Sequence, residues 1–297
     1  MNTEIIDPRY IDLASWPTEI AVEAMLEGQL AAVAAIKAQI PAIAGAADAA
    51  AERLGETGRL VYVGAGTSGR VAVQDGVELY PTYSWPRERV LFLMAGGLAA
   101  LTESAEGAED DEAAARHAVA EARIGASDVV IGVAASGRTP YTVAAIVAAR
   151  TAGALTVGLA NNPDSPLAGA AEHGITVRTG AEIVAGSTRM KAGTAQKAVL
   201  NMLSTATMLR LGRVHRGLMV NMRVSNEKLL HRGREMVRDI AGVDMAAAAD
   251  ALDAAGREIK PAVLIALGAT EAQARQALAQ AGGDLSRAIT AWRAADA

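Results

Sequence analysis

The chain has 297 residues, of which 51% are hydrophobic and 3% are aromatic, and its formal net charge is -5. This length and apolar content suit one large core, with or without a small appendage. Both signs of charge are interspersed, so the chain lacks the basic stripe that nucleic-acid binding requires. The absence of cysteine excludes disulfides, thiolate nucleophiles and cysteine-bound zinc.

The first residues are polar and acidic, without a basic region followed by an apolar one, so we expect no signal peptide. Apolar residues then recur at the helical period over 17–40, which predicts a helix, and a second helix is expected over 41–54. Apolar runs such as 129–135 and 261–268 are too short to cross a bilayer. We therefore expect a cytoplasmic protein with no membrane partner.

Five short apolar segments rich in β-branched residues follow, and helical stretches separate most of them. They are residues 60–63, 90–94, 129–133, 155–159 and 175–177. This alternation is typical of βαβ units whose parallel sheet is covered on both faces. It predicts an α/β protein with a doubly wound five-stranded parallel sheet. Long helical patterns over 190–211 and 219–240 are expected to close the domain.

The region from Gly242 onward is rich in alanine, and three short helices are expected in it. Thr270 and Gln273 form a capping box at the start of the second of these. Residues 258–292 resemble a ubiquitin-associated three-helix module. We favour a helical appendage that packs on the main domain or on a dimer mate over ubiquitin binding. The expected domains are residues 1–241 and 242–297.

A glycine-rich loop, Gly64-Ala65-Gly66-Thr67-Ser68-Gly69, follows the first expected strand. It matches the dinucleotide fingerprint G-x-G-x-x-G, yet the second strand runs into Ala95-Gly96-Gly97, without the acidic residue that holds a ribose hydroxyl. The loop does offer the Thr67 and Ser68 hydroxyls beside backbone N–H groups at a helix N-terminus, where an anion is favoured. It predicts a phosphate site and no nicotinamide cofactor, with a purely structural turn as the alternative.

A second loop, Ser136-Gly137-Arg138-Thr139, ends the third expected strand and again places hydroxyls where a helix begins. The first and third strands are neighbours in the common order 2-1-3-4-5. Ligands bind beyond the carboxyl ends of the strands at that switch point. We therefore expect Ser68, Ser136 and Thr139 to hold one phosphate together with backbone amides.

The two loops resemble those of sugar isomerase (SIS) domains, which bind phosphosugars. The segment 180–197, GAEIVAGSTRMKAGTAQK, is similar to the signature shared by N-acetylmuramic acid 6-phosphate etherases and glucokinase regulatory proteins. The likeness includes 106–110, 201–205 and 218–220. It departs at 75–79, where Asp-Gly-Val-Glu-Leu replaces Asp-Ala-Ser-Glu-Cys and a hydroxyl beside the expected catalytic acid is lost.

The resemblance implies cleavage of the D-lactyl ether at C3 of N-acetylmuramic acid 6-phosphate, giving N-acetylglucosamine 6-phosphate and D-lactate. An ether is a poor leaving group, but the open-chain aldehyde has an acidic C2 proton, so elimination followed by hydration becomes feasible with one acid and one base. By their positions in the family motifs, Glu78 maps to the acid and Glu109 to the base. The residues expected to bind the substrate are Gly66, Thr67, Ser68, Ser136, Gly137, Arg138, Thr139, Glu182, Ser187 and Lys191.

Some alternatives stay open. Glu182 either assists ring opening or makes a structural hydrogen bond, and Arg189 and Lys191 either bind the substrate carboxylate or line a helix N-terminus. The four histidines lack metal-ligand spacing, so no metal is expected. The expected partners are a phosphorylated amino sugar and a second copy of the chain. A phosphosugar isomerase and a phosphosugar-sensing regulator are the rival functions; possession of both Glu78 and Glu109 favours an enzyme.

Overall fold

The computed structural model describes residues 1–103, 105–222 and 224–295 of the chain. Its sheet has five strands in the order β2-β1-β3-β4-β5, and every neighbouring pair is parallel. The strands are β1 (Leu60–Gly64), β2 (Val90–Met94), β3 (Val129–Ala134), β4 (Leu155–Ala160) and β5 (His173–Thr176). The predicted α/β class, the five parallel strands and the switch point between β1 and β3 are confirmed.

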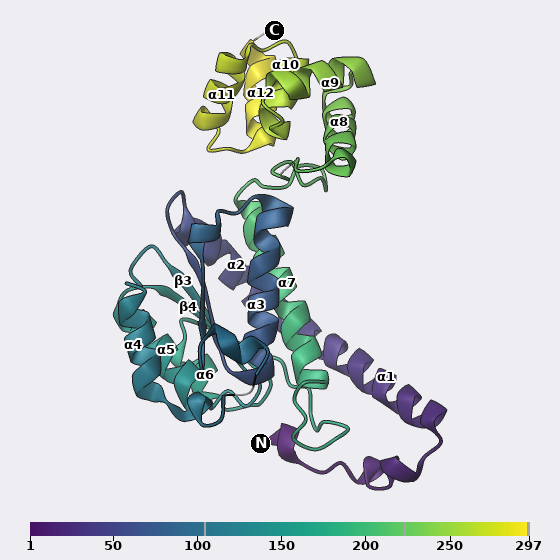
Figure 1. Cartoon of the computed structure of the whole chain (residues 1–297), viewed down its shortest axis with the longest axis vertical. Coiled ribbons are helices and arrows are strands. Elements are labelled where there is room, and N and C mark those ends of the chain that lie inside the picture. The colour runs from purple at the N-terminus through teal and green to yellow at the C-terminus, as the bar shows by residue number, and fades with distance from the viewer. Residues whose placement is uncertain (104, 223, 296–297) are drawn as a thin grey trace. The chain divides into compact units, whose positions relative to one another are not determined.

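Helices cover both faces of this sheet, as Figure 1 shows, with α4, α5 and α6 on one side and α2 and α3 on the other. Their bounds, with that of α7, are α2 (Ile40–Leu54), α3 (Gly66–Tyr83), α4 (Glu112–Glu121), α5 (Pro140–Thr151), α6 (Pro166–Ala170) and α7 (Lys191–Arg210). The residues of β1, β3 and β4 are all buried. Burial on both faces explains why these strands are continuous apolar runs in the sequence.

The end of β1 lies against the first turn of α3. A Cβ atom on Gly64 would lie 2.9 Å from the Cα of Gly69, and a Cβ on Gly69 would lie 3.0 Å from the carbonyl carbon of Gly64. Neither residue therefore tolerates a side chain without a backbone shift. The two glycines allow α3 to begin directly above the sheet.

The N-terminal segment is held beside the loop that follows β4. The Asn162 Oδ1 accepts hydrogen bonds from the backbone N–H of Asn2 (2.7 Å) and Thr3 (3.3 Å), and its Nδ2 donates to the Thr3 hydroxyl (3.1 Å). The Gly186 N–H donates to the Thr3 carbonyl at 2.9 Å. These bonds bring the chain start and the signature segment to the same edge of the sheet.

Helix α1 (Thr18–Ala34), a 3-10 segment (Ala35–Gln39) and α2 form a helical stretch, Thr18–Leu54. By length and composition alone it could cross a membrane, with a mean hydropathy of 1.6; soluble core helices and signal sequences pass the same test. The prediction above considered shorter runs and overlooked this one. On α1, Val22, Leu26 and Leu30 are 56%, 57% and 62% exposed.

Contacts divide the chain into a sheet unit (Met1–Val77 with Glu88–Thr207) and a helical unit (Glu78–Arg87 with Met208–Ala297). The helices wholly inside the latter are α8 (Glu227–Ala241), α9 (Met245–Ala254), α10 (Ile259–Ala266), α11 (Glu271–Gln280) and α12 (Leu285–Ala295). Four helices thus follow Gly242, where three were expected. The main segment of the helical unit begins at Met208, before the boundary expected after residue 241. The reason is that α8 packs into the core of this unit, where its Met236, Val237 and Ile240 lie with Leu252 and Val263. The predicted Thr270–Gln273 capping box is present.

We predict that Gly69→Ala lowers the free energy of unfolding by about 1–3 kcal/mol, because the new methyl group would press on the backbone of Gly64. Gly45→Ala is the matched helical control: a Cβ there would meet nothing within 4 Å. The control should gain about 0.5–1 kcal/mol from the lower backbone entropy of alanine. Urea denaturation of both variants measures the difference, and equal stability of the two would contradict the close approach.

Candidate active site

A pocket of about 430 Å³ lies in the sheet unit at the carboxyl ends of β1 and β3. Gly64 at the end of β1 pairs with Val133 of β3, so the loops after the two strands start at neighbouring points. The residues that line the pocket are Met1, Glu4, Ala65, Gly66, Thr67, Ser68, Glu109, Asp110, Ala135, Ser136, Arg138, Thr139, Pro140 and Thr188. Both predicted hydroxyl loops therefore face one cavity.

The first loop turns directly into α3. Gly66 has a φ of +51°, which favours glycine, and it is the first residue of the helix. Ser68 is buried and Thr67 is half-buried. The first N–H groups of a helix have no acceptor inside it, and together with the helix dipole they favour an anion. The loop thus presents two hydroxyls and backbone donors to the pocket.

The second loop is shaped by Gly137, whose φ is +66°. A Cβ at this position would lie 2.0 Å from the Ser165 Oγ, so only glycine fits. The Ser136 Oγ accepts a hydrogen bond from the Arg138 N–H at 3.0 Å. Thr139 is the N-cap of α5 but makes no side-chain capping bond. Its hydroxyl is therefore not used by the helix that it precedes.

Glu109 lies on a 3-10 helix (Ala108–Asp110) between β2 and α4, and its exposed side chain lines the same pocket. Asp111 fixes the next helix, since its carboxylate accepts the Ala114 N–H at 2.8 Å. Glu109 also lines a second cavity of about 240 Å³, together with Arg70. The Arg70 guanidinium donates to the carbonyls of Ala100 and Leu101, each at 3.0 Å. The structure thus brings the expected base next to both loops.

Glu78 does not line this pocket. It is an exposed residue of α3, about three turns after Gly66, or roughly 18 Å at the helical rise. One turn before it, the buried Asp75 accepts hydrogen bonds from the Tyr62 hydroxyl (2.8 Å), the Asn201 amide (2.6 Å) and the Ser204 hydroxyl (3.1 Å). Burial raises the pKa of Asp75. Asp75 was not among the predicted functional residues.

The altered motif around Glu78 has a packing explanation at Gly76. A Cβ there would lie 2.5 Å from the Phe92 ring and 2.9 Å from the Tyr62 ring. These two rings stack with centroids 5.9 Å apart. Glycine in place of the family's alanine makes room for them. Val77, which replaces the family's serine, is 51% exposed, and nothing in the structure explains that change.

Glu182 is buried and occupies the start of α7. Its two carboxylate oxygens accept the N–H groups of Lys191 and Ala192, each at 2.9 Å. The Lys191 Nζ donates to the Ala181 carbonyl at 2.8 Å, and burial lowers the pKa of Lys191. These contacts match the structural alternative for Glu182.

Of the residues expected to bind the substrate, Gly137, Glu182, Ser187 and Lys191 do not line the pocket, whereas Thr188 does. Met1 and Glu4 also line it and were not predicted. Nothing in the local sequence marks these two residues as part of a site. They are held there through Asn162, far along the chain, which accepts hydrogen bonds from the neighbouring Asn2 and Thr3.

This sheet, with two hydroxyl loops at its switch point, defines a sugar isomerase (SIS) domain. Residues 42–150 match the glucokinase regulatory protein N-terminal SIS domain, and residues 105–206 match the SIS domain. A solved Bacteroides fragilis protein, assigned as a phosphosugar isomerase involved in capsule formation, shares this fold at 22% identity, with a TM-score of 0.50 over 68% of this chain and 99% of that one.

Two curated relatives show which family of SIS-domain proteins the chain belongs to. An N-acetylmuramic acid 6-phosphate etherase from Deinococcus radiodurans is 49% identical over 95% of this chain and 93% of its own length. One from Streptomyces coelicolor is 47% identical over 98% of this chain and 94% of its own. The chain belongs to the N-acetylmuramic acid 6-phosphate etherase family.

We predict that Ser136→Ala weakens phosphosugar binding by about one to two decades, the effect of losing a charge-assisted hydrogen bond of roughly 1.5–3 kcal/mol. The rate of the bound reaction should change less, because the phosphate is remote from C2 and C3. Calorimetric titration and single-turnover rates separate the two effects. Ser225→Ala, at an exposed serine of the helical unit, is the control. Unchanged binding in Ser136→Ala would exclude the loop from the phosphate site.

Proposed function

We propose that the chain is a carbon–oxygen lyase that cleaves the D-lactyl ether of N-acetylmuramic acid 6-phosphate. The products are N-acetylglucosamine 6-phosphate and D-lactate, as in the recycling or catabolism of cell-wall sugars. One observation carries this reading: in a chain of the etherase family, Glu109 lines the same pocket as the two hydroxyl loops. A phosphate held by those loops would leave the sugar carbons within the pocket for a carboxylate to act on.

In the proposed binding mode the phosphate accepts hydrogen bonds from Ser68, Ser136 and Thr139 and from N–H groups at the starts of α3 and α5. Two helix N-termini and three hydroxyls suit a dianion without any metal. Arg138 lines the pocket beside them and adds positive charge. The phosphate then anchors the open-chain sugar while its reacting carbons extend further into the cavity.

In the proposed reaction Glu109 takes the proton from C2 of the open-chain aldehyde. The C3–O bond breaks, a C2–C3 double bond forms, and Glu78 gives a proton to the departing lactate oxygen. Water then adds, its hydroxyl to C3 and a proton to C2, with the two carboxyl groups reversing their roles. Atoms balance as hydrolysis of the ether. The role of Glu109 is supported by its place in the pocket. That of Glu78 is supported by its place in the family motif alone, since Glu78 does not line this pocket.

A phosphosugar isomerase would use the same phosphate loops and a base at C2, but it would keep the lactyl group on the sugar. A phosphosugar-sensing regulator would release the ligand unchanged. Incubating the protein with N-acetylmuramic acid 6-phosphate and assaying D-lactate separates the lyase from both rivals. Only the proposed lyase releases lactate.

We predict that Glu78→Gln and Glu109→Gln fail at different steps, each losing roughly 10²–10⁴-fold in turnover. In heavy water, Glu78→Gln should still exchange the C2 hydrogen of unreacted substrate while forming little lactate. Glu109→Gln should do neither. Glu103→Gln, at a nearby exposed glutamate, should behave as wild type. Solvent oxygen label in the lactate instead of at C3 of the sugar would overturn the elimination route.

We also propose a homodimer, in which the apolar stripe of α1 packs against a second copy of the chain. Val22, Leu26, Leu30 and Val33 follow the spacing of one helix face, and each is at least 46% exposed. Contiguous exposed apolar surfaces of this kind mark sites of association. A second copy would cover them without any further partner. A cytoplasmic location remains a prediction.

We predict that the double variant Leu26→Asp, Leu30→Asp is monomeric, because burying two carboxylates in an apolar interface costs several kcal/mol. Size-exclusion chromatography with light scattering compares its mass with that of wild type. Val147→Asp, at a half-exposed apolar residue of α5, is the control and should keep the wild-type mass. A monomeric wild type at micromolar concentration would count against the interface.

A further inference from the structure

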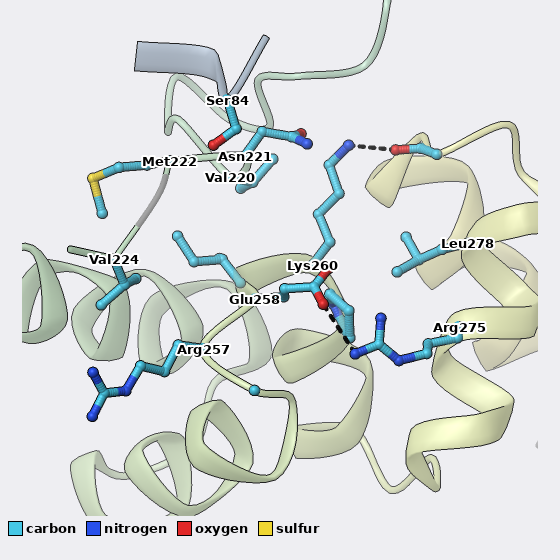
Figure 2. A pocket seen from close by; sticks show the side chains of 14 residues that line it. Ser84, Val220, Asn221, Met222, Val224, Arg257, Glu258, Lys260, Arg275 and Leu278 are labelled. Atoms are coloured by element: carbon cyan, nitrogen blue, oxygen red, sulfur yellow. Dashed lines mark hydrogen bonds and ion pairs between the residues drawn. The ribbon is translucent and has the colours of Figure 1, made fainter. Parts of the chain in front are cut away.

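The helical unit contains a pocket of its own, with a volume of about 620 Å³ (Figure 2). This volume lies within the usual range for small-molecule sites. Its lining residues all belong to the helical unit, and none lines the phosphate pocket. They are Ser84, Val220, Asn221, Met222, Val224, Gly256, Arg257, Glu258, Ile259, Lys260, Pro261, Arg275, Leu278 and Gly283.

Lys260 is the buried cation of this pocket, and only 9% of it is exposed. Its Nζ donates to the Gly283 carbonyl at 2.5 Å, which uses one of its three N–H groups. No carboxylate of the described chain lies within ion-pair distance of it. Burial lowers the pKa of Lys260 to about 8; Arg213 lowers it further and Asp284 opposes the shift. A buried ammonium compensated by one neutral carbonyl has room for an anionic partner.

The remaining charges at the pocket are also mostly positive. Arg257 and Arg275 are exposed lining residues, and Glu258 is the one acid among the described lining residues. The Glu258 carboxylate is already paired with Arg275 at 3.0 Å, as the dashed line in Figure 2 marks. Arg275 is also paired with Glu271 at 3.0 Å, so Lys260 and Arg257 are the cations of the described lining that have no ion pair. The electrostatics of the pocket favour an anion.

Asn221 places a second requirement on any ligand of this pocket. Its Oδ1 is buried and has no hydrogen-bond partner within the described chain, although a buried acceptor normally has one. A ligand that satisfies it must carry a hydroxyl or N–H group in addition to its negative charge. Val220, Met222 and Leu278 supply an apolar wall for carbon atoms.

We propose that this pocket binds a hydroxylated organic anion of the size of a sugar acid or a sugar phosphate. Lys260 pairs with the carboxylate or phosphate group, and Asn221 accepts a hydrogen bond from a hydroxyl. The carbon chain lies on the apolar wall. No residue of this site lines the phosphate pocket of the sheet unit, so its occupancy is measured without substrate.

The test follows the Lys260 side chain itself in the full-length protein carrying isotope-labelled lysine. Its NMR signal is assigned by its loss in Lys260→Arg. Wild type is titrated with gluconate, with glucose 6-phosphate, and with two controls, sulfate and glucose. We expect a saturable shift with gluconate, glucose 6-phosphate or both, and none with glucose. The anion that saturates tells a carboxylate site from a phosphate site. Binding should also raise the pKa of Lys260, seen as a later midpoint in a pH titration.

Two variants test the assignment of the contacts. Asn221→Leu should weaken binding roughly three- to tenfold, as expected for one lost hydrogen bond, with the Lys260 signal retained. Lys228→Gln removes an exposed lysine of α8 that does not line the pocket, and it should leave the affinity unchanged. A Lys260 signal that stays fixed with millimolar gluconate and glucose 6-phosphate would overturn the proposal. So would an equal shift with sulfate, which would mean non-specific ion binding.

Discussion

The contact between the end of β1 and the first turn of α3 is the constraint on which the phosphate pocket depends. Gly64 and Gly69 let two stretches of backbone meet with no side chain between them. This contact fixes the position of the first N–H groups of α3 at the edge of the sheet. Gly137 does the same for the loop after β3, where Ser165 leaves no space for a methyl group. Both hydroxyl loops are therefore positioned by close packing within the fold itself.

The parts that local sequence determines were predictable. Continuous apolar runs, helical periods and hydroxyl-rich turns specify the strands and the two loops within a few residues of sequence, and parallel pairing then brings the loop starts together. Met1 and Glu4 were not predictable, because the segment that carries them is held by Asn162, far away in the chain. Thr188 was not predictable either, because its segment is tied to the chain start by the bond from the Gly186 N–H to the Thr3 carbonyl. The core shared by α8 and α9 was missed for the same reason. Amphipathic periodicity reveals an apolar face but not its partner.

A buried polar cluster shows how the sheet unit holds its central helices together. Asp75 of α3 accepts bonds from Tyr62 of β1 and from Asn201 and Ser204 of α7. All three partners donate, and the Asp75 carboxylate at the centre of the cluster accepts all three hydrogen bonds. The neighbouring Gly76 lets the Tyr62 and Phe92 rings stack against α3. Sequence departures beside the expected acid are in part accommodations to this packing.

Glu182 has a consequence for where an anion binds. The helices α3, α5 and α7 all begin close to residues that line the pocket, so three helix N-termini could compete for a phosphate. Glu182 places both of its oxygens on the first N–H groups of α7. The chain thereby carries its own counter-ion for one helix dipole and leaves the other two open. An anion bound in the pocket would therefore meet the N-termini of α3 and α5 and not that of α7, which Glu182 already occupies.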